Sequence, residues 1–191
     1  GSTEGLACDG NYLYTSIIYT DYTTFTSGNS VVKINLSSNS VEATYTVGNS
    51  PQQLIYNNGS IYVSSTYYDA NWNANHATSL INLSIDEVTI VDHENSVFFG
   101  NDFSIHNNII YRAYNKGIVV LNSDLSIDIS TYIGTEYNGL CAMAINDDLI
   151  YLGFGDYTSP DNVVVLNFDG TEVSNFEVGA SPGSFAFWKS E

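Results

Sequence analysis

The feature that most constrains this chain is a segment of roughly 44 residues that recurs along the sequence. Its clearest copy, Val47 to Val91, begins VGNSPQQLIYNNGSIYVSST and ends SLINLSIDEVTIV. Four short runs rich in β-branched and aromatic residues alternate there with turn residues, and Asn58-Gly59 tolerates the positive φ angles of a tight hairpin. No apolar period of 3.6 residues indicates a helix. The segment therefore predicts four antiparallel strands.

Variants of this segment fill the rest of the chain. Second-strand tyrosines recur at matching places, at Tyr14, Tyr62, Tyr111 and Tyr151. We predict about four repeats, at approximately 6–47, 48–96, 97–139 and 140–183, with an extra strand at 184–188. Four strands per repeat of this length are typical of propeller blades. The predicted fold is all-β, a β-propeller of four-stranded antiparallel blades in one domain over residues 1–191.

The two ends of the chain bear on how such a propeller closes. Leu6 to Cys8 and Ser184 to Trp188 both have the pattern of a first strand. An open stack of blades would expose a strand edge and apolar faces. We therefore favour a closed four-blade ring, with the last segment packed against the first repeat, over a fragment of a larger propeller.

The repeat resembles a known family, the YVTN-type β-propeller repeat. The matching residues are Lys33-Ile34-Asn35, then Val47-Gly48-Asn49-Ser50-Pro51, then Asn58-Gly59-Ser60-Ile61-Tyr62-Val63-Ser64-Ser65. The third repeat matches loosely, because its segment near Thr131 to Gly139 lacks the proline. The resemblance implies a propeller of the kind often found on secreted or surface-layer proteins. It implies no reaction.

The charge of the chain restricts its partners and its location. It carries 4 Lys+Arg against 21 Asp+Glu, a net charge of −17, although charged residues make up only 13% of the sequence. This acidity disfavours nucleic acid and anionic membranes as partners. No apolar run is long enough to span a membrane, so no membrane insertion is expected. The scarcity of basic residues suits an extracellular or cell-surface protein, or one in an acidic medium, where protonated carboxylates leave little repulsion.

The longest connection within a repeat is the strongest candidate for a binding site. It combines aromatic side chains with amides and a carboxylate, as saccharide recognition requires: rings cover C–H faces, and polar groups bind hydroxyls. The candidate ligand-binding residues are Tyr67, Tyr68, Asp69, Asn71, Trp72 and Asn73, with Tyr22 from the corresponding loop of the first repeat. The alternative is a solvated loop with one ring packed on its own blade.

Other candidate chemistry is weaker. The alternating Asp69, Asn71, Asn73 and Asn75 lack the glycine and closing glutamate of a calcium loop. His76, His93 and His106 fall at unrelated repeat positions, which argues against zinc. The pairs Asp147-Asp148 and Asp86-Glu87 occupy predicted turns, where Asp is favoured for backbone reasons. We therefore predict no catalytic residue, no metal ligand and no cofactor.

The chain contains two cysteines, Cys8 and Cys141, which have no metal-ligand spacing. Both fall on or beside predicted first strands, in the first and fourth repeats. These strands would be innermost and neighbouring in a closed ring, close enough for a disulfide. Two buried free thiols are the alternative.

The sequence favours an extracellular recognition or surface-interaction module, whose partner is a glycan or another surface protein. One alternative is a polysaccharide hydrolase or lyase with its site at the propeller axis. Another is a purely structural component of a surface layer or appendage. An enzyme would require polar residues from different repeats to converge at one end of the axis.

Overall fold

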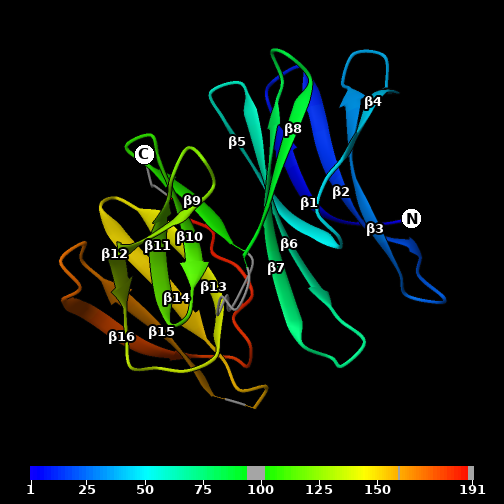
Figure 1. Ribbon diagram of the computed structural model, residues 1–191. Coiled ribbons are helices and arrows are strands. Elements are labelled where there is room, and N and C mark those ends of the chain that lie inside the picture. Colours follow the sequence, from blue (N-terminus) through cyan, green and yellow to red (C-terminus); the bar gives the residue numbers. More distant parts are fainter. Residues whose placement is uncertain (94–101, 159, 189–191) are drawn as a thin grey trace. The chain divides into compact units, whose positions relative to one another are not determined.

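The computed structural model describes residues 1–93, 102–158 and 160–188. Every regular element in this part is a β-strand, and the strands form four sheets of four (Figure 1). The chain divides into two compact units, Gly1–Ser96 and Val97–Glu191, called here the N-terminal and the C-terminal unit. Each unit is described by itself. Within the described residues, no helix has the length and apolar character needed to cross a membrane.

Each sheet is formed by four strands that follow one another in the sequence. The first blade contains β1 (Ser2–Cys8), β2 (Tyr12–Asp21), β3 (Thr26–Asn35) and β4 (Ser40–Thr46). The second contains β5 (Pro51–Asn57), β6 (Ser60–Tyr68), β7 (Ala74–Asn82) and β8 (Glu87–Asp92). The third contains β9 (Phe103–His106), β10 (Ile109–Tyr114), β11 (Gly117–Leu121) and β12 (Ile127–Gly134). The fourth contains β13 (Leu140–Asn146), β14 (Leu149–Phe154), β15 (Asp161–Leu166) and β16 (Glu172–Val178).

Within each blade, every strand pairs antiparallel with the next strand along the chain. This confirms the predicted all-β fold with four-stranded antiparallel blades. The connections between paired strands are short, and left-handed residues such as Asn58 and Asn107 occupy their turns, where an Asn side chain tolerates positive φ. Alternate connections consequently lie at opposite ends of a blade.

The core of the N-terminal unit is built from residues of its two blades. The buried cluster contains Tyr14, Val31, Tyr45 and Val47 from the first blade and its exit, with Leu54, Ile61, Val63 and Ile81 from the second. Successive residues are buried in the second strands, Tyr14 to Ser16 in β2 and Val63 to Ser65 in β6, so both faces of these strands are covered there. The first strand of one blade, β1, packs against the first strand of the next, β5.

A buried hydroxyl joins these two blades. Ser16 is fully buried in β2, and its Oγ accepts a hydrogen bond from the Gly5 amide at 2.8 Å. The same hydroxyl donates to the carbonyl oxygen of Gln52 in β5, also at 2.8 Å. Two main-chain groups that would otherwise lose hydration without compensation are satisfied in this way.

The C-terminal unit has a second core between its two blades. Its buried cluster contains Tyr111, Ala113 and Ile118 from the third blade, with Leu140, Met143, Ile150, Leu152, Phe154, Val164 and Leu166 from the fourth. Polar groups again connect the first strands, since Asp102 Oδ2 accepts from the Met143 amide at 2.8 Å and Ser104 Oγ from the Ile145 amide at 3.1 Å. Burial raises the pKa of the Asp102 carboxyl, and the Met143 amide opposes this effect.

The segment 184–188 differs from the sequence expectation of an additional strand. It forms no strand in the described chain. Instead, the rings of Phe185 and Phe187 lie 6.0 and 4.9 Å from the ring of Tyr151, centroid to centroid. A strand requires a partner edge for its amides and carbonyls, and ring packing on Tyr151 needs none. The predicted ring closure therefore gains no support from strand pairing in this segment and stays a prediction.

Candidate functional site

Three hairpins between the second and third strands of the blades carry highly exposed aromatic side chains. They are the β2–β3, β6–β7 and β14–β15 connections, and the first two lie at the same end of the N-terminal unit (Figure 1). Trp72 is 82% exposed, Tyr157 90% and Phe25 62%. Since large aromatic residues are usually at least partly buried, their repetition at one type of hairpin singles these connections out.

The backbone at these three aromatic residues is unusual. Phe25, Trp72 and Tyr157 have φ angles of 51°, 64° and 67°, in the left-handed region that bulky residues rarely adopt. Most other left-handed positions in the described chain carry Asn, Asp or Gly, which adopt this conformation at lower cost. Strained backbone of this kind concentrates at functional sites.

Neighbouring rings accompany two of these residues. In the first blade, Tyr22 and Phe25 lie 5.3 Å apart between ring centroids, and Tyr19 lies 5.6 Å from Phe25. In the second, Tyr68 lies 6.2 Å from Trp72, with an angle of 50° between the ring planes. The β2–β3 and β6–β7 hairpins consequently each present a small aromatic cluster to solvent.

An aspartate at the start of each hairpin fixes its loop. The Asp69 Oδ1 accepts hydrogen bonds from the amides of Asn71 and Asn73 at 2.8 and 2.9 Å, and its Oδ2 accepts from the Asn73 side chain. Asp21 accepts in the same way from the Thr23 amide, and Asp156 from the Thr158 amide. These are Asx turns, in which the carboxylate replaces a backbone acceptor.

These hydrogen bonds favour the charged form of each carboxylate. The pKa of Asp69 is lowered, first by the Asn73 side chain and then by the Asn73 amide. Hydrogen bonds from Thr23 lower the pKa of Asp21, and those from Thr158 lower the pKa of Asp156. Each of the three loops is therefore held by its own aspartate, whose hydrogen bonds are sensitive to acid.

We expect the hairpin loops to loosen in strong acid. Because the folded-state pKa of Asp69 lies below its ordinary value, the clamp is fully present above the ordinary pKa of about 3.9 and is lost as the pH falls through the folded value. NMR should then show a loss of protection from amide exchange, measured against the intrinsic rate at each pH, at Asn71 and Asn73 between pH 5 and pH 2. Asp69→Asn is the control, since its loop should show no such transition. Unchanged protection in the unmodified protein would contradict the clamp.

The structure places the predicted site residues in different roles. Tyr22, Tyr68 and Trp72 are exposed rings, as saccharide contact requires. Asp69 is engaged in its own loop, and Asn73 donates its amide to it, which leaves Asn71 as the freer polar group of the set. Sequence reasoning missed Phe25 and Tyr157 as site residues. Only Tyr157 had a sequence signal, because Asp156-Tyr157-Thr158 repeats Asp21-Tyr22-Thr23.

Tyr67 differs from its neighbours. It lines a hollow of about 150 Å³ with Asn75, His76, Asp92 and His93, and its hydroxyl donates to Asp92 Oδ1 at 3.3 Å. Burial, followed by the charge of Asp92, raises the pKa of Tyr67. Two histidines that appear unrelated in sequence are thus neighbours, although the described residues contain no group of three or more His, Cys, Asp or Glu arranged to hold a metal.

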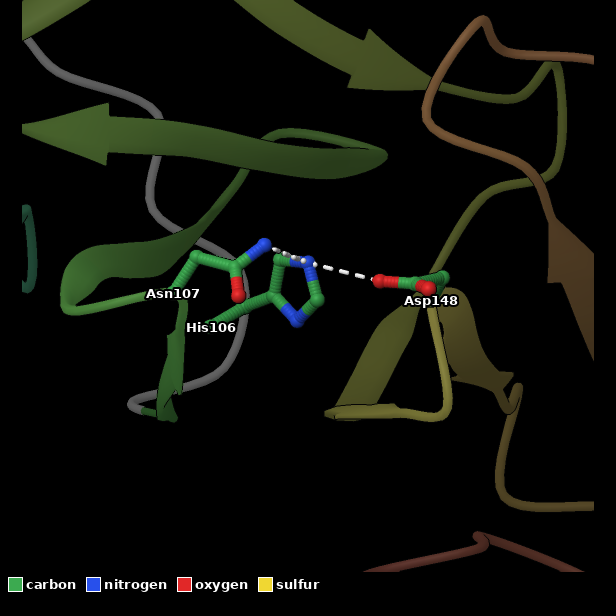
Figure 2. A network of polar contacts seen from close by, with 3 residues as sticks. All are labelled: His106, Asn107 and Asp148. Carbon is green, nitrogen blue, oxygen red and sulfur yellow. Dashed lines mark hydrogen bonds and ion pairs between the residues drawn. The ribbon is translucent and has the colours of Figure 1, made fainter.

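The third histidine takes part in a separate contact within the C-terminal unit. His106 and Asn107 lie at the β9–β10 turn, and Asp148 lies at the β13–β14 turn (Figure 2). His106 Nε2 is 3.0 Å from Asp148 Oδ1 and 2.8 Å from Asn107 Nδ2. Asp148 has a left-handed backbone, so this member of the acidic pair does serve a turn.

The cysteines occupy the predicted first strands. Cys8 ends β1 and is exposed, while Cys141 lies in β13 and is partly buried. Burial, followed by the charge of Asp161, raises the pKa of the Cys141 thiol. Both thiols are free. A bridge between them would join the two separately described units, and it stays a prediction.

Comparison with known proteins supports the fold. No family model and no curated protein matches the chain. Among solved structures, a hydrazine synthase from Kuenenia stuttgartiensis aligns with 93% of the chain at a TM-score of 0.69 and 14% identity. A nidogen/laminin complex aligns with 92% at 0.62 and 12%, and a glucose dehydrogenase with 84% at 0.57 and 11%.

The chain spans 49%, 64% and 59% of the length of these three structures. Sequence identities this low support a similarity of fold alone. They support a propeller-like arrangement of strands and leave the YVTN repeat type without confirmation.

Proposed function

We propose that this chain is an extracellular recognition module that binds saccharides through the aromatic residues of its second-to-third-strand hairpins. The observation that carries the proposal is the recurrence of an exposed aromatic residue in left-handed backbone at three such hairpins, at Phe25, Trp72 and Tyr157. An Asn or Gly would satisfy these turns at lower cost. The presence of rings at these positions is best explained by contact with a partner.

The chemistry of the hairpins supports a neutral saccharide. Exposed rings cover the C–H faces of a sugar, and Asn71 can exchange hydrogen bonds with hydroxyl groups. The net charge of −17 opposes acidic polysaccharides. The clamps at Asp21, Asp69 and Asp156 hold the loops before a ligand arrives, which reduces the entropy lost on binding.

Trp72→Ala should weaken saccharide binding about tenfold or more, because an exposed ring that stacks on a ligand contributes on the order of 1–2 kcal/mol. A glycan array would identify the ligand, and titration calorimetry would give the affinity. The melting temperature should change by less than about 2 °C, since Trp72 is 82% exposed.

Ile85→Ala is the matched control. Ile85 is 59% exposed in the β7–β8 turn of the same blade, at the end opposite the β6–β7 hairpin. Its removal should leave the affinity unchanged. Absence of any array ligand, or equal losses in both variants, would contradict the proposal.

A protein partner is the second candidate. One structural neighbour is a nidogen/laminin complex, and exposed aromatic residues are also common anchors of protein interfaces. Competition separates the two candidates: a soluble oligosaccharide should displace a glycan from the hairpins, whereas a protein interface should resist it. The hydrolase or lyase and the structural-component alternatives stay predictions from sequence.

A further inference from the structure

The C-terminal unit contains a groove that the proposed saccharide site does not use. It has a volume of about 710 Å³ and lies between strands β10 to β12 of the third blade and the β15–β16 turn of the fourth. This volume falls within the range of small-molecule sites. The residues that carry the argument are Tyr111, Thr131, Tyr132, Phe168 and Asp169.

The corresponding place in the N-terminal unit is filled by a side chain. There Tyr45 of β4 is buried, and its hydroxyl donates to Asp86 in the β7–β8 turn at 2.8 Å. Strand register identifies the corresponding residue of the third blade. Val31 of β3 pairs with Tyr45, and Ile118 of β11, which occupies the same place in its blade, pairs with Ile133. An isoleucine therefore stands at the groove where the first blade has a tyrosine ring.

Strand β12 is also distorted at this point. Its register with β11 shifts between the Ile118–Ile133 pair and the Val120–Asp128 pair. The Thr131 hydroxyl stabilises the irregularity, because its Oγ1 accepts from the Val120 amide at 2.9 Å and donates to the Asp128 carbonyl oxygen at 2.6 Å. Bulges of this kind are common beside binding sites, where they redirect side chains.

Aromatic rings form the walls of the groove. Phe168 and Tyr111 lie 5.6 Å apart, edge to face, and Tyr132 is 38% exposed. His106 stacks on Phe168 with 4.8 Å between centroids and 25° between planes. The ring of His106 is itself held by Asp148 (Figure 2), so Phe168 is supported at its position.

The groove has an acidic character. Asp169 is the one charged residue among the described residues that line it. Its Oδ1 accepts from the Thr171 amide at 2.8 Å, and hydrogen bonds from Thr171 lower its pKa, so the carboxylate remains ionised at neutral pH. Aromatic faces beside a carboxylate attract organic cations, whose charge interacts with the ring quadrupoles and the anion together.

We propose that this groove binds a small organic cation of the quaternary ammonium class, with its alkyl groups against Tyr111, Tyr132 and Phe168 and its charge near Asp169. The three rings supply apolar and cation–π contact, and the net charge of −17 favours the approach of cations. This binding is independent of the hairpin rings.

Choline and its uncharged isostere 3,3-dimethylbutan-1-ol are the matched probes. In NMR titrations of the full chain at low salt, choline should shift the amides of Val120, Tyr132 and Gly170 in a saturable manner. The isostere should bind at least about fivefold more weakly, since it keeps the shape and loses the charge. Equal shifts with both probes, or no saturable shift with choline, would overturn the proposal.

Two variants test whether Asp169 is the carboxylate that attracts the cation. Asp169→Asn should weaken choline binding about fivefold or more. Asp124→Asn is the control, because Asp124 makes the same Asx turn with the Ser126 amide in the β11–β12 turn of the same unit, outside the groove. It should leave the affinity within about twofold of the unmodified protein. An equal loss in both variants would reveal general attraction to an acidic protein and would overturn the assignment to the groove.

Discussion

Gly5→Ala should lower the free energy of unfolding of the N-terminal unit by about 3 kcal/mol or more. Gly5 is buried in β1, where the main chain approaches the carbonyl oxygen of Gln52 in β5. A Cβ at this position would lie far inside van der Waals contact with that oxygen. Because main-chain atoms cannot rotate away as a side chain can, the two blades must separate. The Ser16 hydrogen bonds that join them would lengthen as well.

Denaturant unfolding followed by circular dichroism would measure this effect. Gly179→Ala is the control, since a Cβ there meets no atom within 4 Å and its φ is not in the left-handed region. Its free energy of unfolding should stay within about 0.5 kcal/mol of the unmodified protein. A comparably small effect of Gly5→Ala would show that β1 and β5 are not in close contact in solution.

Tyr14→Ala should destabilise the same unit by about 3–5 kcal/mol, the range of large aromatic-to-alanine changes in protein cores. Tyr14 has no exposed surface and contributes its ring to the cluster between the two blades. Its hydroxyl donates to Asp9 Oδ2 at 2.9 Å. Burial, followed by this hydrogen bond, holds the pKa of Tyr14 well above its usual value, so the hydroxyl stays protonated.

Tyr14→Phe separates the ring from the hydroxyl. It should cost only about 1–2 kcal/mol, because Asp9 keeps its hydrogen bonds from the amides of Asn11 and Tyr12. Tyr22→Ala, at a position that is 63% exposed, should change the stability by less than about 0.5 kcal/mol. The difference in the free energy of unfolding between the Ala and Phe variants of Tyr14 would separate the contribution of ring packing from that of the hydrogen bond to the turn. Equal losses for the Ala and Phe variants would contradict the importance of the ring.

The second strands of the blades could be predicted from the sequence, and the full length of the longest hairpin could not. The recurring tyrosines Tyr14, Tyr62, Tyr111 and Tyr151 lie in β2, β6, β10 and β14, as the repeat pattern predicted. The β6–β7 hairpin continues to Tyr68 and resumes at Ala74, whereas the sequence predicted a long loop there. Polar residues lie on both faces of this two-stranded extension, so the sequence shows no alternation of apolar positions. The extension is formed by main-chain pairing alone.

The candidate site was predictable only in part. Trp72 and Tyr68 stand out in a polar stretch, and the structure exposes both. The role of Asp69 as a loop clamp depends on backbone angles that composition does not reveal. The groove of the C-terminal unit was missed entirely, because it arises where Ile133 stands in place of a tyrosine and a strand changes register. A smaller side chain at one position produces no recognisable sequence motif.

Three side-chain hydrogen bonds between neighbouring blades end on the main chain of the receiving strand. Ser16 contacts the carbonyl of Gln52, and Asp102 and Ser104 contact the amides of Met143 and Ile145. None of these hydrogen bonds depends on which side chain the receiving residue carries. A duplicated blade could therefore dock on its neighbour without any compensating substitution at those positions. The receiving residues Gln52, Met143 and Ile145 accordingly include polar and apolar side chains, and these three hydrogen bonds place no demand on which kind is present.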